Sequence, residues 1–333
     1  MRVSIPRYLL VESLLKLGKK LKKEGIPESV ILQSVEHNPW YTRYYISYSL
    51  KAILSWFSED SLAQFLDKYP ERDKYPAEVG IITAGNLPLV GFHDVLITLL
   101  SGNRALVKPS HRDEILLQWL VGVWMELCPQ LKKQVCFGKI PSHVDFLITT
   151  GSNNTARYIE AEYRNTPKIL RKNRFSVAIA GSEMLESEIE ALCDDILLYN
   201  GLGCRNVSNL LILPGFDWEL FGEKISRYSV ERLNPLYLER VLHQRSLMEV
   251  LDKPFQSWQN LIVEPEENLG ISSMGVLRTI QILNEAELLN MLTHNRSNIQ
   301  CIVGQETAFG MAQQPGLGNF ADNLDTMAIL TNI

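Results

Sequence analysis

Short strand-forming runs alternate with helical segments from residue 78 onward, and this alternation constrains the fold more than any other feature of the sequence. Strand-like apolar runs occur at residues 79–82, 104–107, 145–149 and 176–180. Helical segments occur between them at residues 90–100, at 115–127 and from about residue 155. Because such alternation is typical of parallel sheets covered by helices, the sequence predicts an α/β fold with a doubly wound, mostly parallel sheet.

Polar, mostly glycine-containing loops follow three of these strands. They are residues 83–86, 108–110 and 149–152, with the sequences Thr-Ala-Gly-Asn, Lys-Pro-Ser and Thr-Thr-Gly-Ser. Ligands of doubly wound sheets bind beyond the carboxyl ends of the strands. We therefore expect these three loops to lie together and to bind a ligand.

The rest of the chain is predicted to form helices before this sheet and a second α/β lobe after it. Amphipathic helical patterns occur at residues 8–23, 28–38 and 44–66. Further strand-like runs occur at residues 210–213, 260–263, 275–283 and 299–303, with helical segments at 218–250, broken at Pro235, and at 285–292. A chain of 333 residues is long enough for two domains. We expect a helical segment plus a first domain at residues 1–175, a second domain at 176–314 and a tail at 315–333.

A cysteine preceded by two glycines is the strongest candidate for a chemical centre. An apolar helical approach ends in Gly201-Leu202-Gly203, and Cys204 follows at once. Glycines permit unusual backbone dihedrals and a close approach by a ligand, which a buried packing cysteine does not need. A thiolate is the attacking species in acyl transfer, and thiols become more acidic near a cation such as Arg205. A buried structural cysteine is the alternative, since free cysteine is among the most buried residue types.

Composition and charge exclude several classes of protein. The chain has 33 basic and 38 acidic residues and a net charge of −5, without a long basic run, so nucleic acid is not an expected partner. Its five cysteines are widely spaced, with no CxxC pair or His/Cys cluster, and indicate neither a disulfide framework nor a zinc site. The first residues lack the pattern of a secretory signal, and no apolar run has the length of a membrane span. We therefore expect a cytoplasmic protein without a membrane span or a bound metal.

Four motifs, in this order, resemble the aldehyde dehydrogenase superfamily. They are Asn86-Leu87-Pro88, residues 101–110 (Ser-Gly-Asn-Arg-Ala-Leu-Val-Lys-Pro-Ser), Thr150-Gly151-Ser152 and Gly201-Leu202-Gly203-Cys204. The helical N-terminal segment, the form of residues 84–94 and the ending Asp325-Thr326-Met327 are similar to the acyl-CoA reductase branch related to the LuxC fatty acid reductase. The resemblance implies an aldehyde dehydrogenase-like fold of two α/β lobes. These would be a doubly wound dinucleotide-binding domain and a catalytic domain, with a short C-terminal oligomerisation segment.

Within this resemblance, the roles of individual residues carry over position by position. Cys204 matches the nucleophile that takes up the acyl group, and Asn86 matches the amide that stabilises the oxyanion together with the backbone N–H at the cysteine. Lys108 matches the lysine that binds the ribose and adenine end of the dinucleotide. Gly151 and Ser152 match the loop over the pyrophosphate. A turn residue is the alternative for Asn86, and a surface lysine is the alternative for Lys108.

Two departures from the family pattern bear on the reaction. Residues 170–175, Leu-Arg-Lys-Asn-Arg-Phe, hold no acid where many members have a glutamate that activates water. A thioester that is not readily hydrolysed can be formed from another thiol, so the chain favours acyl-thioester reduction over aldehyde oxidation. A second family glutamate, which holds the nicotinamide ribose, has no equivalent near residues 272–275.

The residues after the predicted cofactor lysine bear on the choice of nucleotide. Ser110 ends the Lys-Pro-Ser motif, and His111 and Arg112 follow it in place of the glutamate common in NAD-preferring relatives. An acid repels a 2′-phosphate, whereas an arginine can bind one. We expect NADPH as the cofactor, with NADH as the alternative. The predicted cofactor-binding residues are Lys108, Ser110, Arg112, Gly151 and Ser152.

The resemblance implies reduction of an acyl-CoA or acyl-carrier thioester to an aldehyde, with the acyl group bound to Cys204 and hydride delivered by NADPH. The alternatives are a reductase of acyl phosphates, an aldehyde dehydrogenase, and a nucleotide-binding pseudoenzyme subunit of an acyl-transfer complex. His93 is a candidate proton donor, with a satisfied helical histidine as the alternative. A homodimer is expected, because the apolar residues 328–333 can supply an edge strand. An acyl-transferase or synthetase is a candidate partner.

Overall fold

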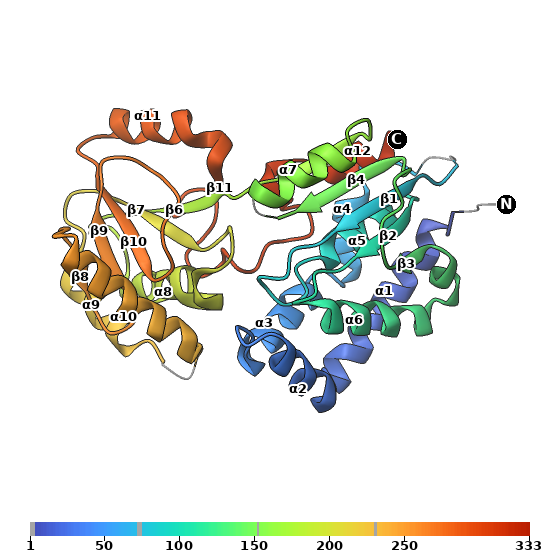
Figure 1. The fold of residues 1–333 in the computed structure, drawn as a ribbon, viewed down its shortest axis with the longest axis horizontal. Helices are drawn as coiled ribbons and strands as arrows, with labels where there is room; N and C mark the ends of the chain where they lie inside the picture. The colour runs from blue at the N-terminus through green and yellow to red at the C-terminus, as the bar shows by residue number, and fades with distance from the viewer. Residues whose placement is uncertain (1–3, 72–74, 152, 230–231) are drawn as a thin grey trace. The chain divides into compact units, whose positions relative to one another are not determined.

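The computed structural model describes residues 4–71, 75–151, 153–229 and 232–333, and the chain divides into two compact units. Unit 1 comprises Met1–Asn173 together with Gly316–Ile333, and unit 2 comprises Arg174–Pro315. Both units combine helices with a sheet, as the alternating pattern predicts (Figure 1).

The N-terminal part of unit 1 is helical. Its helices are α1 (Arg7–Glu24), α2 (Glu28–His37), α3 (Arg43–Leu54) and α4 (Glu59–Leu66). The sequence pattern predicts one helix over residues 44–66, but the structure has two, because Ser58 starts a new helix. The Ser58 hydroxyl oxygen accepts a hydrogen bond from the Ser61 N–H at 3.1 Å, as N-cap residues do. Trp56 and Phe57, in the turn between the two helices, are both buried, so the break in the helix does not expose these aromatic side chains.

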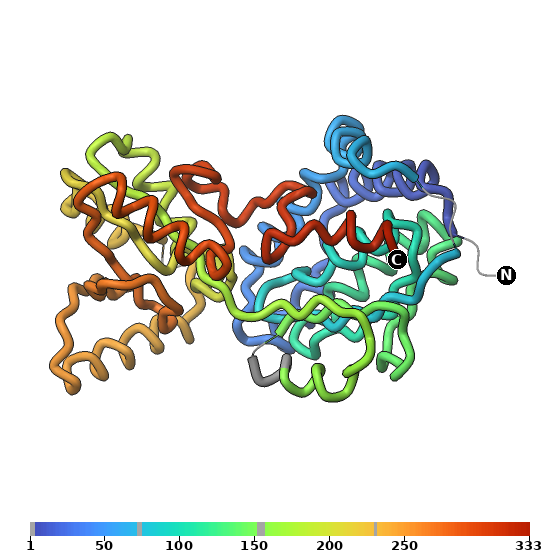
Figure 2. Tube along the Cα trace, turned by 90° about the horizontal axis from the view of Figure 1, so that it is seen from above, coloured from blue at the N-terminus to red at the C-terminus, as the bar shows by residue number. Residues whose placement is uncertain are grey.

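Five parallel strands form the sheet of unit 1, in the order β3-β2-β1-β4-β5. The strands are β1 (Glu78–Ile82), β2 (Arg104–Lys108), β3 (Val135–Phe137), β4 (Phe146–Thr150) and β5 (Lys168–Arg171). The connecting helices are α5 (Phe92–Leu100), α6 (Glu114–Leu127) and α7 (Asn153–Glu162). Because the sheet grows outward from β1 in both directions, right-handed crossovers place α7 on the face opposite α5 and α6 (Figures 1 and 2).

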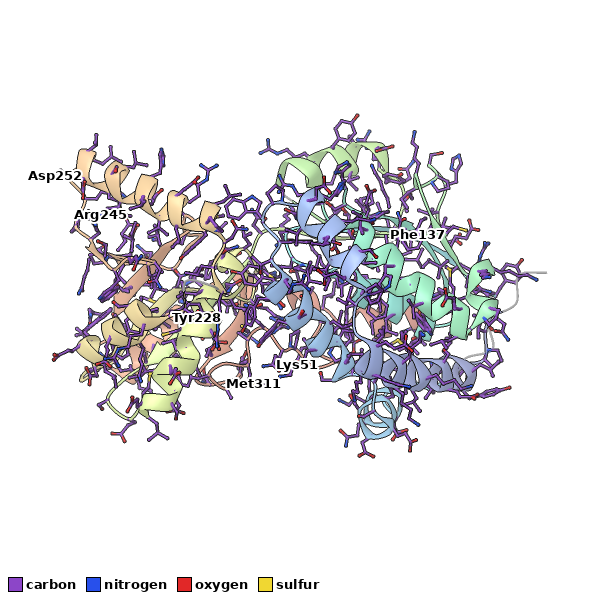
Figure 3. The ribbon with its side chains drawn as sticks, turned by 90° about the horizontal axis from the view of Figure 1, so that it is seen from below. Lys51, Phe137, Tyr228, Arg245, Asp252 and Met311 are labelled. Atoms are coloured by element: carbon purple, nitrogen blue, oxygen red, sulfur yellow. The ribbon has the colours of Figure 1, made fainter. Side chains whose placement is uncertain are left out.

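Two of these strands, β3 and β5, are not predicted by the alternating pattern. Both lie at edges of the sheet, β3 is three residues long, and β5 carries Lys168 and Arg171 at its ends. Figure 3 labels Phe137, the last residue of β3. Short edge strands bury few apolar residues, so their sequence signal is weak.

A six-stranded sheet forms the centre of unit 2, in the order β11-β6-β7-β10-β9-β8. Its strands are β6 (Phe175–Ala180), β7 (Val207–Ile212), β8 (Gln256–Ser257), β9 (Ile262–Pro265), β10 (Val276–Gln281) and β11 (Ile299–Val303). Its helices are α8 (Glu186–Leu197), α9 (Trp218–Arg227), α10 (Pro235–Val250) and α11 (Glu285–Asn295). Only the β8–β9 pair is antiparallel among the described strands. None of the helices in the described part of the chain is both long enough and apolar enough to span a membrane.

The end of the chain is a helix and not the edge strand predicted for residues 328–333. Helix α12 (Thr326–Thr331) begins where the Asp325 carboxylate accepts a hydrogen bond from the Ala328 N–H at 2.8 Å. Met327 and Leu330 are fully buried, and the carbonyl of Leu330 accepts a hydrogen bond from the Asn103 side chain at 2.8 Å. The apolar residues therefore have helical spacing, and they bury the tail within unit 1.

A buried ion pair links three parts of unit 1. Arg171, at the end of β5, donates a hydrogen bond from Nη1 to Oδ2 of Asp94 on α5 at 2.6 Å. Its Nη2 donates to the Thr326 hydroxyl of α12 at 3.2 Å. The two charged side chains are only 6% and 5% exposed. Removing one partner of such a pair leaves an uncompensated buried charge.

Replacing Arg171 with leucine should therefore lower the free energy of unfolding by about 3–5 kcal/mol, the usual cost of an unpaired buried charge. Urea denaturation measures this. The matched control is Arg43→Leu, which breaks an exposed pair with Glu28 and should cost at most about 1 kcal/mol. The double variant Asp94→Leu/Arg171→Leu should recover much of the loss. An equal loss of free energy of unfolding in Arg171→Leu and Arg43→Leu would contradict the stabilising role of the buried pair.

Candidate active site

The loop that carries Cys204 follows helix α8 in unit 2. Tyr199, Asn200 and Gly201 have positive φ angles of 55°, 58° and 67°, so the chain makes a tight left-handed turn before it enters β7. Glycine adopts such angles readily, whereas Tyr199 and Asn200 adopt them only where surrounding contacts compensate. Cys204 lies after this turn with an exposed side chain. The structure therefore does not support the alternative of a buried packing cysteine.

Asn206 braces this loop from inside. Its side-chain oxygen accepts a hydrogen bond from the Gly203 N–H at 2.8 Å. Its amide nitrogen donates to the carbonyls of Asp195, Ile196 and Leu198 at 3.2, 3.3 and 2.7 Å. These carbonyls belong to the C-terminal end of α8, where backbone acceptors lack helical partners. One buried side chain thus ties the residue before Cys204 to the preceding helix.

A second contact holds the backbone of Cys204 itself. The Ser176 hydroxyl on β6 donates to the Cys204 carbonyl at 2.8 Å and accepts from the Cys301 N–H on β11 at 3.2 Å. The buried Cys301 thiol lies 3.1 Å from the same hydroxyl oxygen. Burial raises the pKa of Cys301, although its hydrogen bond with Ser176 opposes this. Of these two thiols, only that of Cys204 is exposed.

Asp195 is a buried carboxylate under the same loop. Its two oxygens accept hydrogen bonds from the Gly310 N–H at 2.7 Å and the Ala312 N–H at 2.9 Å. Burial raises its pKa to about 7, although these two hydrogen bonds oppose the shift. Because the Asp195 carbonyl also accepts from Asn206, the residue connects the segment around Gly310 to the loop of Cys204.

The Asn206→Ala variant tests whether the hydrogen bonds of Asn206 hold the loop that carries Cys204. It leaves one N–H and three carbonyls without their partner, so unit 2 should lose about 1–3 kcal/mol of stability and the backbone amides of residues 202–206 should exchange hydrogen faster. Urea denaturation and hydrogen-exchange mass spectrometry measure the two effects. The exposed Asn290 on α11 provides the control substitution Asn290→Ala. Unchanged exchange in residues 202–206 would show that Asn206 does not hold the loop.

Asp195 should make stability fall as the pH rises. In the unfolded chain the carboxyl ionises near pH 4, whereas in the folded chain it keeps its proton until about pH 7. The free energy of unfolding should thus decrease by up to about 1.4 kcal/mol per pH unit between these values, relative to Asp195→Asn. Denaturation curves at pH 5, 6 and 7 measure the slope, with the exposed Glu267→Gln as control. If the free energy of unfolding of wild type and of Asp195→Asn changed with pH in the same way, the raised pKa of Asp195 would be refuted.

The loop that carries Asn86 lies in unit 1, between β1 and α5. Asn86 is partly exposed, and Gly85 before it packs against the loop after β2. A Cβ atom at Gly85 would lie 2.4 Å from the Ser110 hydroxyl oxygen, so only glycine fits without a shift. The Thr83 hydroxyl accepts a hydrogen bond from the Ser110 N–H at 3.0 Å. The first two predicted ligand loops are therefore in direct contact.

Further polar side chains fix the Asn86 loop from the helical side. The Asn38 amide donates to the carbonyls of Gly85 and Arg112, each at 3.3 Å. The Asp113 carboxylate accepts from the N–H of Leu89, a residue with a φ of 60°, at 3.1 Å. Burial raises the pKa of Asp113 to about 8. These bonds hold a strained backbone in place next to Asn86.

The predicted cofactor residues occupy the carboxyl edge of the unit 1 sheet. Lys108 ends β2 with an exposed side chain, Ser110 is partly exposed, and Arg112 is exposed. Gly151 follows β4, and its N–H donates to the Arg171 carbonyl at 3.4 Å. Ser152 lies outside the described residues. Since β1, β2 and β4 are adjacent and parallel, the structure brings these loops and that of Asn86 to one edge, as predicted.

His93 makes the contacts of a structural histidine, which is the alternative that the sequence offers to a proton donor. Its Nε2 lies 2.9 Å from the carbonyl oxygen of Leu317, and its ring contacts the rings of Trp56 and Phe320. These contacts join α5 to the returning C-terminal segment.

Five supporting residues of the two loops are not revealed by the sequence, because their partners are mostly backbone atoms of other segments. They are Asn38, Asp113, Ser176, Asp195 and Asn206. The mostly polar run at residues 205–209, which follows Cys204, is the local feature of the sequence that contains Asn206.

Comparisons with known proteins agree with the sequence motifs. Residues 17–215, more than half of the chain, match the family described as acyl-CoA reductase (LuxC). A search of curated proteins finds no match.

Solved aldehyde dehydrogenases have a similar fold. A putative aldehyde dehydrogenase from Burkholderia cenocepacia has a TM-score of 0.63 and 15% identity, covering 86% of this chain and 71% of that one. The aldehyde dehydrogenase KauB from Pseudomonas aeruginosa gives 0.63 and 15%, covering 86% and 70%. A Mycobacterium tuberculosis aldehyde dehydrogenase complexed with NAD+ gives 0.61 and 16%, covering 86% and 70%. The predicted aldehyde dehydrogenase-like α/β fold is confirmed.

Proposed function

The chain belongs to the acyl-CoA reductase (LuxC) family, and on this premise we propose that it reduces an acyl thioester to an aldehyde through an acyl group bound to Cys204. The observation that carries the proposal is an exposed thiol on a backbone held from both sides, by Asn206 through Gly203 and by Ser176. A nucleophile needs such access for the substrate and such constraint for its own position.

The proposed reaction begins at the sulfur of Cys204. Its thiolate attacks the carbonyl carbon of the thioester, a new C–S bond forms, and the carrier thiol leaves with a proton. The Asn86 side chain donates an N–H to the oxygen on which negative charge develops. When bound, a reduced nicotinamide dinucleotide supplies the hydride that reduces the acyl group. The oxygen of the reduced acyl group takes up a proton from solvent. When the C–S bond to Cys204 breaks, this oxygen gives up its proton as the C=O bond re-forms, the sulfur accepts a proton, and an aldehyde and the Cys204 thiol result.

The segment at residues 170–175 supports reduction over hydrolysis. It contains no acid, and Arg171 within it is committed to the buried pair with Asp94. A guanidinium stays protonated and cannot act as a base toward water. The acyl group on Cys204 therefore lacks a water-activating base from this segment, and a thiol or a hydride is its expected acceptor.

The residues of unit 1 fit a dinucleotide. Lys108 and Arg112 are exposed cations at the carboxyl edge of the sheet, where open α/β sheets bind nucleotides. The absence of a side chain at Gly85 lets the first two loops pack closely. We assign NADPH over NADH because Arg112 can bind a 2′-phosphate. Lys108, Ser110 and Gly151 are assigned to the rest of the dinucleotide, and so is Ser152, outside the described residues.

Covalent labelling tests the nucleophile. Incubation with a series of acyl-CoA thioesters, without nucleotide, should add one acyl group to the wild-type chain, as measured by intact-mass spectrometry. Cys204→Ala should remain unlabelled. Cys136→Ala is the matched control, because Cys136 is the other exposed cysteine, and it should label as wild type does. An unlabelled wild type, or label on Cys204→Ala, would refute the assignment.

Turnover of the same preparation then separates the remaining possibilities. Release of CoA and formation of aldehyde, faster with NADPH than with NADH, is the expected result. Release of phosphate from acyl phosphates, or nucleotide reduction by an aldehyde, would identify a different reaction of the same thiol. Nucleotide binding without turnover of any acyl thioester would indicate a pseudoenzyme.

A further inference from the structure

Three side chains that commonly ligate metals meet on the surface of unit 1. His37 is the last residue of α2, His111 lies in the turn after β2, and Glu114 is the first residue of α6. One ligand atom from each residue lies within 4.8 Å of the other two. His37 and His111 are 74 residues apart in the chain. Residues this far apart form no short His/Cys motif, so the sequence alone did not indicate this cluster.

The contacts within the cluster are close. Nε2 of His37 lies 3.4 Å from Oε1 of Glu114 and 2.5 Å from the backbone carbonyl oxygen of His111. The two imidazole rings stack with centroids 4.2 Å apart at an interplanar angle of 25°. The His37 and Glu114 side chains are 26% and 37% exposed, so both are partly accessible to solvent.

Helix dipoles explain two of the three residues but not the third. A histidine at the C-terminus of α2 and a glutamate at the N-terminus of α6 are each favourable next to the partial charge of their helix end. Neither dipole accounts for His111, whose ring stacks on that of His37 beside a single carboxylate. An imidazole nitrogen with a free lone pair is a common ligand of transition-metal ions, so the pairing of these two rings beside a carboxylate points to a cation.

We propose that His37, His111 and Glu114 bind a divalent transition-metal ion, and that Zn²⁺ is the best match. Two imidazole nitrogens and one carboxylate oxygen are a ligand set that Zn²⁺ accepts in four-coordinate sites with one position left for water. The fourth position is left to water, because the His111 carbonyl oxygen, 2.5 Å from Nε2 of His37, is too close to that nitrogen for both atoms to bind one four-coordinate ion. Mg²⁺ and Ca²⁺ prefer all-oxygen sites and fit less well.

The cluster sits where it would stiffen the loops at the carboxyl edge. His111 and Glu114 flank Arg112 and Asp113, and Asp113 accepts the hydrogen bond from Leu89 in the Asn86 loop. Asn38 follows His37 directly and bonds the carbonyls of Gly85 and Arg112. A metal ion would thus cross-link the end of α2 to residues 111–114. The inference rests on unit 1 alone and does not depend on the proposed reaction.

Direct metal binding tests the proposal in the full chain carrying Cys204→Ala and Cys136→Ser, which removes the two exposed thiols as competing ligands. After chelator treatment and desalting, titration with Zn²⁺ against a chromophoric chelator should show one tight equivalent, and Co²⁺ should give the intense visible absorption of a four-coordinate site. Adding His111→Ala or Glu114→Gln should weaken binding at least tenfold and abolish the Zn²⁺-dependent rise in melting temperature.

The control is His243→Ala, which removes an exposed histidine from α10 in unit 2 and should leave binding unchanged. His111 is exposed, so its replacement is expected to leave the fold intact, and the melting temperature without metal verifies this. Failure to bind one equivalent, or equal affinity with and without His111 and Glu114, would overturn the proposal. Acyl labelling of Cys204 is measured separately in the chain that retains this cysteine, so failure of one proposal is distinguishable from failure of the other.

Discussion

The parallel pairing of β1 with β2 and β4 is the constraint on which the arrangement of unit 1 depends. Once these strands run in the same direction, the loops after residues 82, 108 and 150 leave from one edge of the sheet. Their closeness then requires a residue without a side chain where two of them touch, and Gly85 meets that requirement against Ser110. The other polar contacts of this edge, from Thr83, Asn38 and Asp113, fit this geometry.

In unit 2, the backbone around Cys204 is held by hydrogen bonds while its side chain is exposed. The left-handed turn at residues 199–201 is costly for non-glycine residues and persists only with compensation. The compensation is visible in the hydrogen bonds of Asn206 to the end of α8 and of Ser176 to Cys204. The Cys204 side chain makes none of these bonds and is exposed, so constraint of the backbone and access to the thiol are compatible.

Buried charged groups serve the architecture in both units. Asp94 and Arg171 pair across three elements of unit 1, Asp113 holds Leu89, and Asp195 holds the segment around Gly310. Each of these groups is engaged by a nearby N–H donor or cation, which is the condition for burying a carboxylate.

The sequence by itself determined the α/β class, the principal strands and the grouping of three loops at one edge, but it left Cys204 open between an accessible nucleophile and a buried packing residue. These properties follow from local alternation and from glycine placement, which are encoded within a few residues. Only the tertiary structure decided that residues 44–66 form two helices, that β3 and β5 complete the sheet and that the chain ends in a helix. Caps at Ser58 and Asp325 and pairing with distant strands control these outcomes. The brace of Asn206 and the cluster of His37, His111 and Glu114 likewise arise from residues brought together by folding, because hydrogen bonds to backbone atoms and contacts over 74 residues leave no local pattern.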